Sequence, residues 1–302
     1  MLSRIDILKE LGKGINIFPL NMDNIKENSV NLCTSKFAWA TDSCDIYINE
    51  NEQEKEERFS LTETVNSKKY RIEKGKSAVV KNGDKEYIIL LPLSTTLIET
   101  KEVLSIGENI GGTYHSKVGM VSKGLGHVGT MLGPNFSGDS LIAIHNVSGK
   151  LLVLEVGESF ISVVFHYLDT PYTQVNPTQS GHIEKFSQFG IRISDGENAE
   201  LNADWKKKRF EVRTRMMDSE QYERVQKELR NLRKANIKGY LNWTNAIILV
   251  TLVVTLAVLF LWAKSMDQKT GGTVWVDRFF NVGCSGILVA FVTFMFNHIK
   301  RR

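Results

Sequence analysis

The side chains that most often perform chemistry are spread along this 302-residue chain without a catalytic or metal-binding spacing. The histidines do not recur at the intervals that place two imidazoles on one metal ion; five of them are His115, His127, His145, His166 and His182. The cysteines, Cys33, Cys44 and Cys284, form no CxxC pair. This pattern argues against a thiolate zinc site or a disulfide framework and favours a reducing compartment. We therefore expect neither a metal ion nor a cofactor.

Two glycine-rich stretches have the composition of phosphate-binding loops. In the run Gly111-Gly112-Thr113-Tyr114, backbone N–H groups could contact an anion, although a plain structural turn explains the run equally well. Residues 124–129 match GxGxxG letter for letter, but no strand–helix–strand pattern surrounds them, so we discount a dinucleotide site. Gly112, Thr113 and Tyr114 remain candidate ligand-binding residues.

A basic cluster lies late in the chain. Its members are Lys206, Lys207, Lys208, Arg209, Arg213 and Arg215. Attraction to anionic lipid is our preferred interpretation, and a nucleic-acid site is the alternative. The net charge is +4, but 241–302 hold six of the 38 basic and two of the 34 acidic residues, which leaves 1–240 neutral. A neutral body argues against a duplex-DNA binder with a broad basic face.

Short β-type runs fill residues 30–170 and must position any site in the first half of the chain. They alternate with glycine-containing turns, and Asn82-Gly83 predicts a hairpin between the run that ends at Lys81 and the strand at Glu86. A short helix that leads into a strand is expected at the N-terminus. The fold class predicted for this part is mainly β, a barrel or a jelly-roll-like body.

A helical pattern follows the basic cluster. Asp218 can cap a helix, with Gln221 three residues later, and a seam then recurs at spacings of 3, 4, 3 and 4 through Tyr222, Val225, Leu229, Leu232 and Asn236. Just over two heptads are present. A short coiled coil and an amphipathic helix packed on its own domain are both open interpretations.

Two uncharged stretches near the C-terminus have the composition of membrane-spanning helices. Ala246–Ala263 is 18 residues long, close to the ~20 that cross a bilayer, and Phe279–Asn297 follows after a loop with Gly271-Gly272. Lysine and arginine residues flank the outer ends of the pair. The positive-inside rule then predicts a multi-pass membrane protein with both termini in the cytoplasm.

Small and polar residues form a stripe along the second of these stretches. The stripe consists of Gly283, Gly286, Ala290, Thr293 and Asn297, and the first stretch has a weaker equivalent in Thr251 and Thr255. Such a face is expected to meet protein or water rather than lipid. Close helix packing and the lining of an ion pathway are both consistent with it.

Several short motifs resemble those of the dCTP deaminase and dUTPase superfamily. Leu2-Ser3 with Asp6-Ile7 resembles the LS-x-x-DI opening, residues 116–119 resemble A-R-L-G, and residues 134–138 resemble P-G-W-S-G. Residues 146–150 are similar to N-S-G-K, and 185–190 are similar to the K-Y-x-x-Q-x-G lid. The resemblance covers about residues 1–192 and implies a dUTPase/dCTP deaminase-like β-barrel.

The sequence departs from this family at the positions that carry its chemistry. The resemblance places the catalytic glutamate of deaminases at Ala143 and the water-activating acid of dUTPases at Gly133. A methyl group cannot act as a general base. Asp139 lies on the same side of the strand as Ala143 but about 13 Å away at ~3.3 Å per residue, too far to substitute. We therefore expect no enzymatic activity.

A nucleotide pocket without catalysis is what the resemblance then implies. The family's phosphate motif places one arginine at Gly112 and a second at Lys117, which keeps the charge. Lys117, Lys185 and Gln188 would contact a phosphate or an oligonucleotide backbone, together with Gly112, Thr113 and Tyr114. Surface lysines without a ligand are the alternative interpretation.

The full layout resembles bacterial antiphage transmembrane effectors, including the Hailong type. It implies a β domain at 1–192, a basic linker and juxtamembrane helix at 193–243, and a transmembrane hairpin at 244–302. The expected function is a nucleotide- or oligonucleotide-sensing effector of antiphage defence in the bacterial inner membrane, either a ligand-gated channel or a membrane-disrupting protein, assembled as a homo-oligomeric trimer or tetramer. Its partners would be the bilayer, the ligand and a nucleotidyltransferase that acts through its product. The alternatives are a membrane-anchored dCTP deaminase or dUTPase and a non-conducting scaffold.

Overall fold

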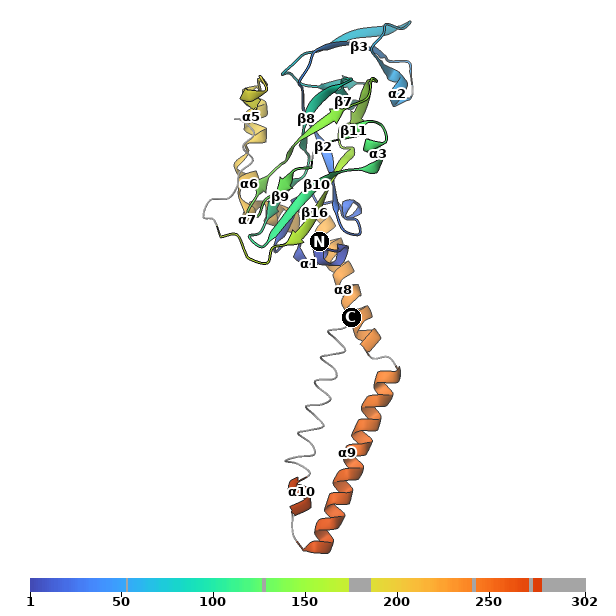
Figure 1. Ribbon diagram of the computed structural model, residues 1–302, viewed down its shortest axis with the longest axis vertical. Helices are drawn as coiled ribbons and strands as arrows, with labels where there is room; N and C mark the ends of the chain where they lie inside the picture. The colour runs from blue at the N-terminus through green and yellow to red at the C-terminus, as the bar shows by residue number, and fades with distance from the viewer. Residues whose placement is uncertain (53, 127–128, 174–185, 241–242, 272–273, 279–302) are drawn as a thin grey trace. The chain divides into compact units, whose positions relative to one another are not determined.

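The computed structural model divides the chain into two compact units, Met1–Leu229 and Arg230–Arg302. It describes all residues except 53, 127–128, 174–185, 241–242, 272–273 and 279–302. The division falls within the predicted juxtamembrane segment 193–243, most of which belongs to the first unit (Figure 1).

The first unit is built mainly from strands. They are β1 (Ile15–Phe18), β2 (Val30–Ala40), β3 (Cys44–Asn49), β4 (Phe59–Ser60), β5 (Ser67–Ile72), β6 (Val79–Asn82), β7 (Lys85–Leu90), β8 (Ser94–Thr100), β9 (Val103–Ile106), β10 (Ile110–Ser116), β11 (Leu125–Gly126), β12 (Met131–Leu132), β13 (Ser137–Gly138), β14 (Leu141–Asn146), β15 (Leu152–Glu155) and β16 (Ser159–Tyr167). The prediction of a mainly β body is confirmed.

Helices precede and follow the strands of this body, and short helical turns lie between some of them. Helices also form the described part of the second unit. They are α1 (Arg4–Glu10), a 3-10 turn η1 (Met22–Asn24), α2 (Lys55–Arg58), α3 (Val118–Val121), α5 (Asp195–Leu201), α6 (Asp204–Lys207), α7 (Arg209–Met217), α8 (Glu220–Tyr240), α9 (Trp243–Thr270) and α10 (Val274–Arg278). Ser3 and Asp6 form a capping box that begins α1, which leads into β1 as expected.

Antiparallel pairing organises the strands into one large and three small sheets. The seven-stranded sheet has the order β11-β14-β8-β2-β16-β10-β12, and the smaller sheets are β1-β9-β13, β15-β7-β6 and β4-β3-β5. β6 and β7 pair through Asn82 and Lys85, and Gly83 has φ +62° between them, which confirms the predicted hairpin. The side chains between the sheets form one continuous apolar core that includes Ile7, Leu32 and Phe165.

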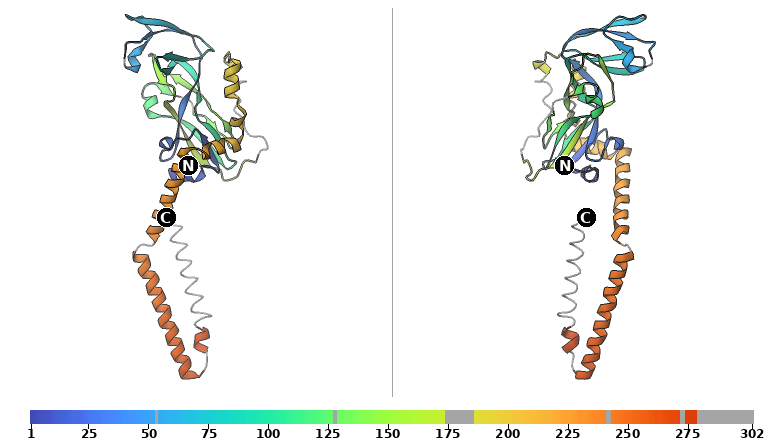
Figure 2. Two further views of the ribbon diagram at one scale, coloured as in Figure 1. Left: turned by 180° about the vertical axis from the view of Figure 1, so that it is seen from behind. Right: turned by 45° about the vertical axis from the view of Figure 1, so that its right-hand side comes forward.

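Residues 195–217, which form α5, α6 and α7, fold back on the β body and are called here the returning segment. Figure 2 shows α5, α6 and α7 along one flank of the strands. Val212 and Met216 of α7 are fully buried, and Val225 of α8 is buried in the main core with Tyr222 and Leu229 packed against it. Of the two interpretations of the 222–236 seam, the packed amphipathic helix therefore holds for its first three members.

The predicted membrane-spanning hairpin is corrected by the structure. Among the described residues, no helix combines the length and the apolar character needed to cross a bilayer. The stretch of α9 whose side chains are described without a gap, residues 253–269, includes Lys264, Asp267 and Lys269. This finding overturns the fold class with two transmembrane helices and the location in the bacterial inner membrane.

Few of the proposed stripe residues can be placed. Thr251 and Thr255 lie on α9, where the Thr255 hydroxyl donates a hydrogen bond to the Thr251 carbonyl at 2.7 Å. The rest of the stripe, Gly283, Gly286, Ala290, Thr293 and Asn297, lies outside the described residues. Near its C-terminal end α9 contacts α10: Trp262 and Trp275 meet edge to face at 5.7 Å, and Asp267 accepts hydrogen bonds from the backbone N–H groups of Trp275 and Val276.

Candidate functional site

The glycine-rich run proposed to bind phosphate lies inside the large sheet. Gly112 pairs with Phe165 of β16 on one side and with Leu132 of β12 on the other. The Tyr114 side chain is buried, and its hydroxyl lies 2.6 Å from the Ser140 hydroxyl; burial raises the pKa of Tyr114 well above its ordinary value. The Thr113 hydroxyl oxygen forms a hydrogen bond with His115 Nε2 at 2.8 Å. These side chains and backbone groups are occupied by the fold itself.

Of the three remaining predicted ligand-binding residues, the described part of the structure places Lys117 and Gln188. Lys117 donates hydrogen bonds from Nζ to the Ser159 carbonyl at 3.2 Å and to the Ser159 hydroxyl at 3.0 Å. It lines a cavity of about 640 Å³ together with Lys123 and Lys150, and Gln188 is not among the described residues that line it. Gln188 is exposed at the end of the helical residues 186–188, and Lys185 lies outside the described residues.

Ala143, where the resemblance places the catalytic glutamate of deaminases, faces apolar side chains. Ala143 of β14 pairs with Leu97 of β8 and packs, with Leu141 and Ile193, against a second apolar cluster. This cluster, called here the flank cluster, consists of Phe37, Trp39, Leu97, Phe186, Ile191 and Leu201. Trp39 is stacked against Phe37 with ring centroids 6.3 Å apart and meets Phe186 at 4.6 Å. A charge at position 143 would be placed beside these rings.

A second cavity opens beside the flank cluster, between the β body and the returning segment. Its volume is about 650 Å³, within the ~300–1,000 Å³ typical of small-molecule sites. Polar and charged side chains contribute much of its lining: Thr34, Ser35, Lys36, Glu86, Thr100, Lys101, Asp139, Glu200 and Lys206. Phe37 lines both the cavity and the flank cluster, and Trp205 adds a second aromatic ring. We refer to it as the β2–α5 cavity.

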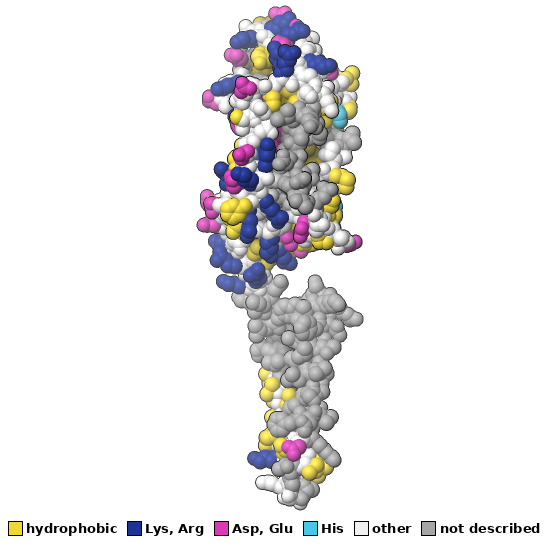
Figure 3. Space-filling view, turned by 90° about the vertical axis from the view of Figure 1, so that its left-hand side faces the viewer, with side chains coloured by type: hydrophobic (Ala, Val, Ile, Leu, Met, Phe, Trp, Pro, Cys, Tyr) yellow, Lys and Arg dark blue, Asp and Glu magenta, His cyan; other side chains and the backbone are white. Residues whose placement is uncertain are grey.

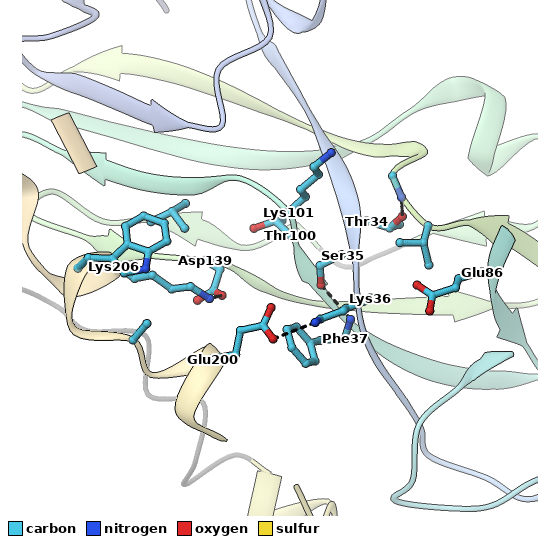
Figure 4. A pocket seen from close by; sticks show the side chains of 15 residues that line it. Thr34, Ser35, Lys36, Phe37, Glu86, Thr100, Lys101, Asp139, Glu200 and Lys206 are labelled. Atoms are coloured by element: carbon cyan, nitrogen blue, oxygen red, sulfur yellow. Dashed lines mark hydrogen bonds and ion pairs between the residues drawn. The ribbon is translucent and has the colours of Figure 1, made fainter. Parts of the chain in front are cut away.

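One buried ion pair forms an end of this cavity. Lys206 Nζ lies 2.7 Å from Asp139 Oδ2, and the two side chains are only 12% and 5% exposed. Figure 4 shows the pair on one side of the cavity, apart from Glu86 and Thr34. The Ser137 hydroxyl also donates to the Lys206 carbonyl at 2.8 Å, so α6 is held to the sheet by both backbone and side chain.

A second ion pair crosses the cavity and is open to solvent. Lys36 Nζ lies 2.9 Å from Glu200 Oε2, and each side chain is 53% exposed. The same ammonium group is 5.2 Å from the centre of the Phe37 ring. Ser35 accepts a hydrogen bond from the backbone N–H of Phe37 at 3.1 Å, which leaves its hydroxyl proton free to donate to a ligand (Figure 4).

The other hydroxyl groups of the lining are committed to the fold. Thr34 donates to the Glu155 carbonyl and accepts from Gly157 N–H, while Thr100 donates to the Glu102 carbonyl and accepts from Ser140 N–H. Lys101, in contrast, has no ion-pair partner among the described residues, and Figure 4 shows it directed away from the Lys36–Glu200 pair. Of the described lining residues, Ser35 and Lys101 can therefore contact a ligand directly, and Lys36 can do so once its exposed pair with Glu200 opens.

A buried acid, Glu102, lies in the turn between β8 and β9. Glu102 is 4% exposed and accepts a hydrogen bond from Cys33 N–H at 2.7 Å. Desolvation raises the pKa of Glu102 above its ordinary value, because burial disfavours the charged form. Burial, assisted by the charge of Glu102, raises the pKa of the Cys33 thiol to about 11, so this thiol is protonated at neutral pH.

The basic cluster of residues 206–215 is less free than its sequence suggested. Lys206 is paired with Asp139, Arg215 lies over the Trp205 ring at 4.6 Å, and Arg209 donates to the Lys13 carbonyl. Figure 3 shows Lys and Arg side chains gathered on the face along which α6 and α7 run. Much of the cluster therefore anchors the returning segment to the β body.

Sequence reasoning missed most of the residues that build the β2–α5 cavity. It considered Asp139, which it set aside as too distant from Ala143, and it assigned Lys206 to the basic cluster. Lys36 and Lys101 stand far from each other and from Glu200 in the chain, and these three belong to no motif. No sequence signal could have joined them, because strand order and the docking of α5 and α6 bring them to one place. Among the described residues, no group of His, Cys, Asp and Glu is placed to hold a metal ion.

Comparison with known proteins yields similarity at the level of structure. No family model matches the sequence, and no curated protein matches it either. The EIAV dUTPase is 16% identical over 33% of this chain and 92% of its own, with a TM-score of 0.26. The dUTPase of Staphylococcus bacteriophage 80alpha, solved with dUpNHpp, is 18% identical over 34% of this chain and 83% of its own, with a TM-score of 0.26.

A dCTP deaminase is similar over a longer part of the chain. The enzyme from Agrobacterium tumefaciens is 11% identical over 54% of this chain, with a TM-score of 0.34, and this chain spans 45% of its length. The similar structures are thus dUTPase and dCTP deaminase folds. At such identities and TM-scores they carry no conclusion about activity or ligand.

Proposed function

We propose that this protein binds a nucleotide or a short single-stranded oligonucleotide in the β2–α5 cavity and senses it without turning it over. The observation that carries the proposal is the composition of the cavity, which combines lysines, a free hydroxyl and aromatic rings in about 650 Å³. Ammonium groups bind phosphate oxygens, and aromatic faces accept a nucleobase. Gating of a membrane channel is not part of this proposal.

The lack of turnover rests on what surrounds the family's catalytic position. Ala143 offers no proton acceptor, and its neighbours Phe37, Trp39 and Leu97 are apolar. Gly133, at the dUTPase position, likewise has no side chain to activate water. The nearest buried acid that lines the cavity, Asp139, is neutralised by Lys206. A general base must lie within hydrogen-bond reach of the attacking water, and these residues provide none.

Calorimetry on the full chain tests binding. We expect dCTP, dTTP or a short DNA oligonucleotide to bind the wild type, and Lys101→Gln to weaken that binding about tenfold, the loss of one charge-assisted contact. Lys85→Gln is the matched control, because Lys85 forms an exposed pair with Glu155 outside the cavity lining. Equal affinities of the two variants, or no binding of any probe to the wild type, would reject the proposed site.

A separate assay tests the absence of turnover. Incubation of the wild type with dCTP and with dUTP should release neither ammonia nor pyrophosphate above a mock purification. Release that an inactivating mutation in the β body abolishes would support instead the enzyme that the sequence analysis kept as an alternative.

A further inference from the structure

The ion pair between Lys36 and Glu200 places a carboxylate of the protein where a ligand's anionic group would bind. Lys36 lines the β2–α5 cavity from strand β2, and Glu200 reaches it from α5, at 2.9 Å from the ammonium nitrogen. Within this cavity Glu200 is thus an internal competitor for any phosphate that approaches Lys36.

The exposure of the two cavity ion pairs decides which of them a ligand can open. Lys36 and Glu200 are each 53% exposed, so water and ions reach both partners. Asp139 and Lys206 are 5% and 12% exposed, and separating them would leave a buried charge without a partner. An exposed pair exchanges partners readily, whereas the buried pair stays closed.

The ion pairs that hold α5 and α6 to the β body therefore differ in strength. Glu200 and Leu201 are consecutive in α5, and Lys36 and Phe37 are consecutive in β2. The outer residues form the ion pair, while Phe37 and Leu201 belong to the flank cluster. α5 has only seven residues, and a helix this short depends on its contacts for stability.

We infer that the Lys36–Glu200 pair is a latch that a phosphate group opens. The phosphate takes the place of the Glu200 carboxylate on Lys36, and the last turn of α5 loses its polar tether to β2. α6 remains anchored through Lys206 and Asp139. Ligand binding is thereby converted into a local loosening of α5, the change that a sensor needs. This inference rests on the proposed function and specifies its ligand class and its regulation.

A double-mutant cycle measures the competition directly. Affinity for dCTP is determined by calorimetry for the wild type, Glu200→Gln, Lys36→Gln and the double variant, with inorganic pyrophosphate as the probe for an anion without a base. We expect Glu200→Gln to bind dCTP at least about threefold more tightly and Lys36→Gln about tenfold more weakly. In the Lys36→Gln background the gain from Glu200→Gln should vanish, because the competitor then has no site to occupy.

Hydrogen exchange provides the second readout. Amides of Asp195–Leu201 should exchange faster when dCTP is added to the wild type, and should already exchange fast in ligand-free Glu200→Gln. Amides of α6 should keep their protection in both. Since Glu200 is half exposed, its substitution leaves the buried core intact and folding of the variant can be verified by its unchanged melting temperature.

The outcomes separate the latch from the proposed function. Suppose that dCTP binds the wild type and that Lys101→Gln weakens this binding. If Glu200→Gln then leaves the affinity for dCTP unchanged, or raises it by the same factor in the Lys36→Gln background, the latch is wrong and the binding site remains supported. If neither dCTP nor pyrophosphate binds the wild type or Glu200→Gln, both are wrong. If pyrophosphate shows the full cycle and dCTP does not bind, the latch responds to a free polyphosphate and the nucleotide proposal fails alone.

Discussion

Removal of the Lys206 ammonium group tests how the returning segment is fixed to the β body. Lys206→Met keeps an unbranched side chain of similar length but leaves Asp139 without its partner. The Asp139 side chain is 5% exposed, and its Oδ2 lies 2.7 Å from the Lys206 nitrogen. The hydrogen bond from Ser137 to the Lys206 carbonyl involves the backbone and survives the substitution.

The expected cost follows from this burial. Breaking a buried ion pair by removing one partner costs about 3–5 kcal/mol, because the remaining charge is left in a poorly solvated place. For a domain of this size each kcal/mol lowers the melting temperature by about 2–4 °C, so a decrease of about 6–20 °C is expected. In the double variant Asp139→Asn/Lys206→Met neither charge remains, and most of the loss should be recovered.

Denaturant and thermal unfolding of the full chain at pH 7.5, followed by tryptophan fluorescence, measure this effect. Trp205 neighbours Lys206 in α6, so the probe reports on the anchored region. The matched control is Lys85→Met, which opens the pair between Lys85 and Glu155 at 2.9 Å with side chains 59% and 37% exposed. We expect no measurable change in the control. A Lys206→Met variant as stable as the control would refute the view that this pair anchors α6.

Two further predictions concern backbone packing and pH. Gly75→Ala should destabilise the protein more than Gly157→Ala: both glycines have positive φ, which costs an alanine about 1–2 kcal/mol, but only at Gly75 would the new Cβ lie 2.4 Å from the Gly190 carbonyl oxygen. Urea midpoints of the two variants measure the difference, and equal midpoints would contradict the packing argument. Glu102→Gln should stabilise the protein at pH 7 but not at pH 4, because burial raises the pKa of Glu102 above its ordinary value of 4.5. The protonated acid is tolerated in the buried site at low pH, and this stability is lost as the pH rises above 4.5 and the folded protein must bury a charge. Melting temperatures between pH 4 and 8 give the profile, and a gain that is constant across this range would exclude titration of Glu102 as its cause.

The correct predictions about the fold came from residue patterns that are local in the sequence. The helix that begins at Ser3, the hairpin at Asn82 and Gly83, and the succession of strands from Val30 to Tyr167 all depend on residues within a few positions of one another. Capping side chains, turn residues and alternation act over that distance, so a single sequence displays them. The seam from Tyr222 to Leu229 was likewise recognisable as helical, although only the structure shows that it packs on its own domain.

The prediction from apolar run length was the one that failed. The run Ala246–Ala263 carries no charge, and its length suggested a bilayer as the partner. Among the described residues no helix meets the requirement for a span. Composition over a window does not specify the contacts of its residues: Ala263 is 3% exposed, whereas Val253 and Val258 are more than half exposed.

The sequence by itself determined that the body is mainly β, because strand and turn patterns are local, and that Ala143 and Gly133 carry no acidic side chain. Only the tertiary structure decided where the available cations meet. Lys36 and Lys101 reach one cavity because β2 pairs with β8, and Glu200 and Lys206 join them because α5 and α6 fold back on that flank. Strand order and the docking of a returning segment depend on contacts between distant residues, which no spacing within the chain records.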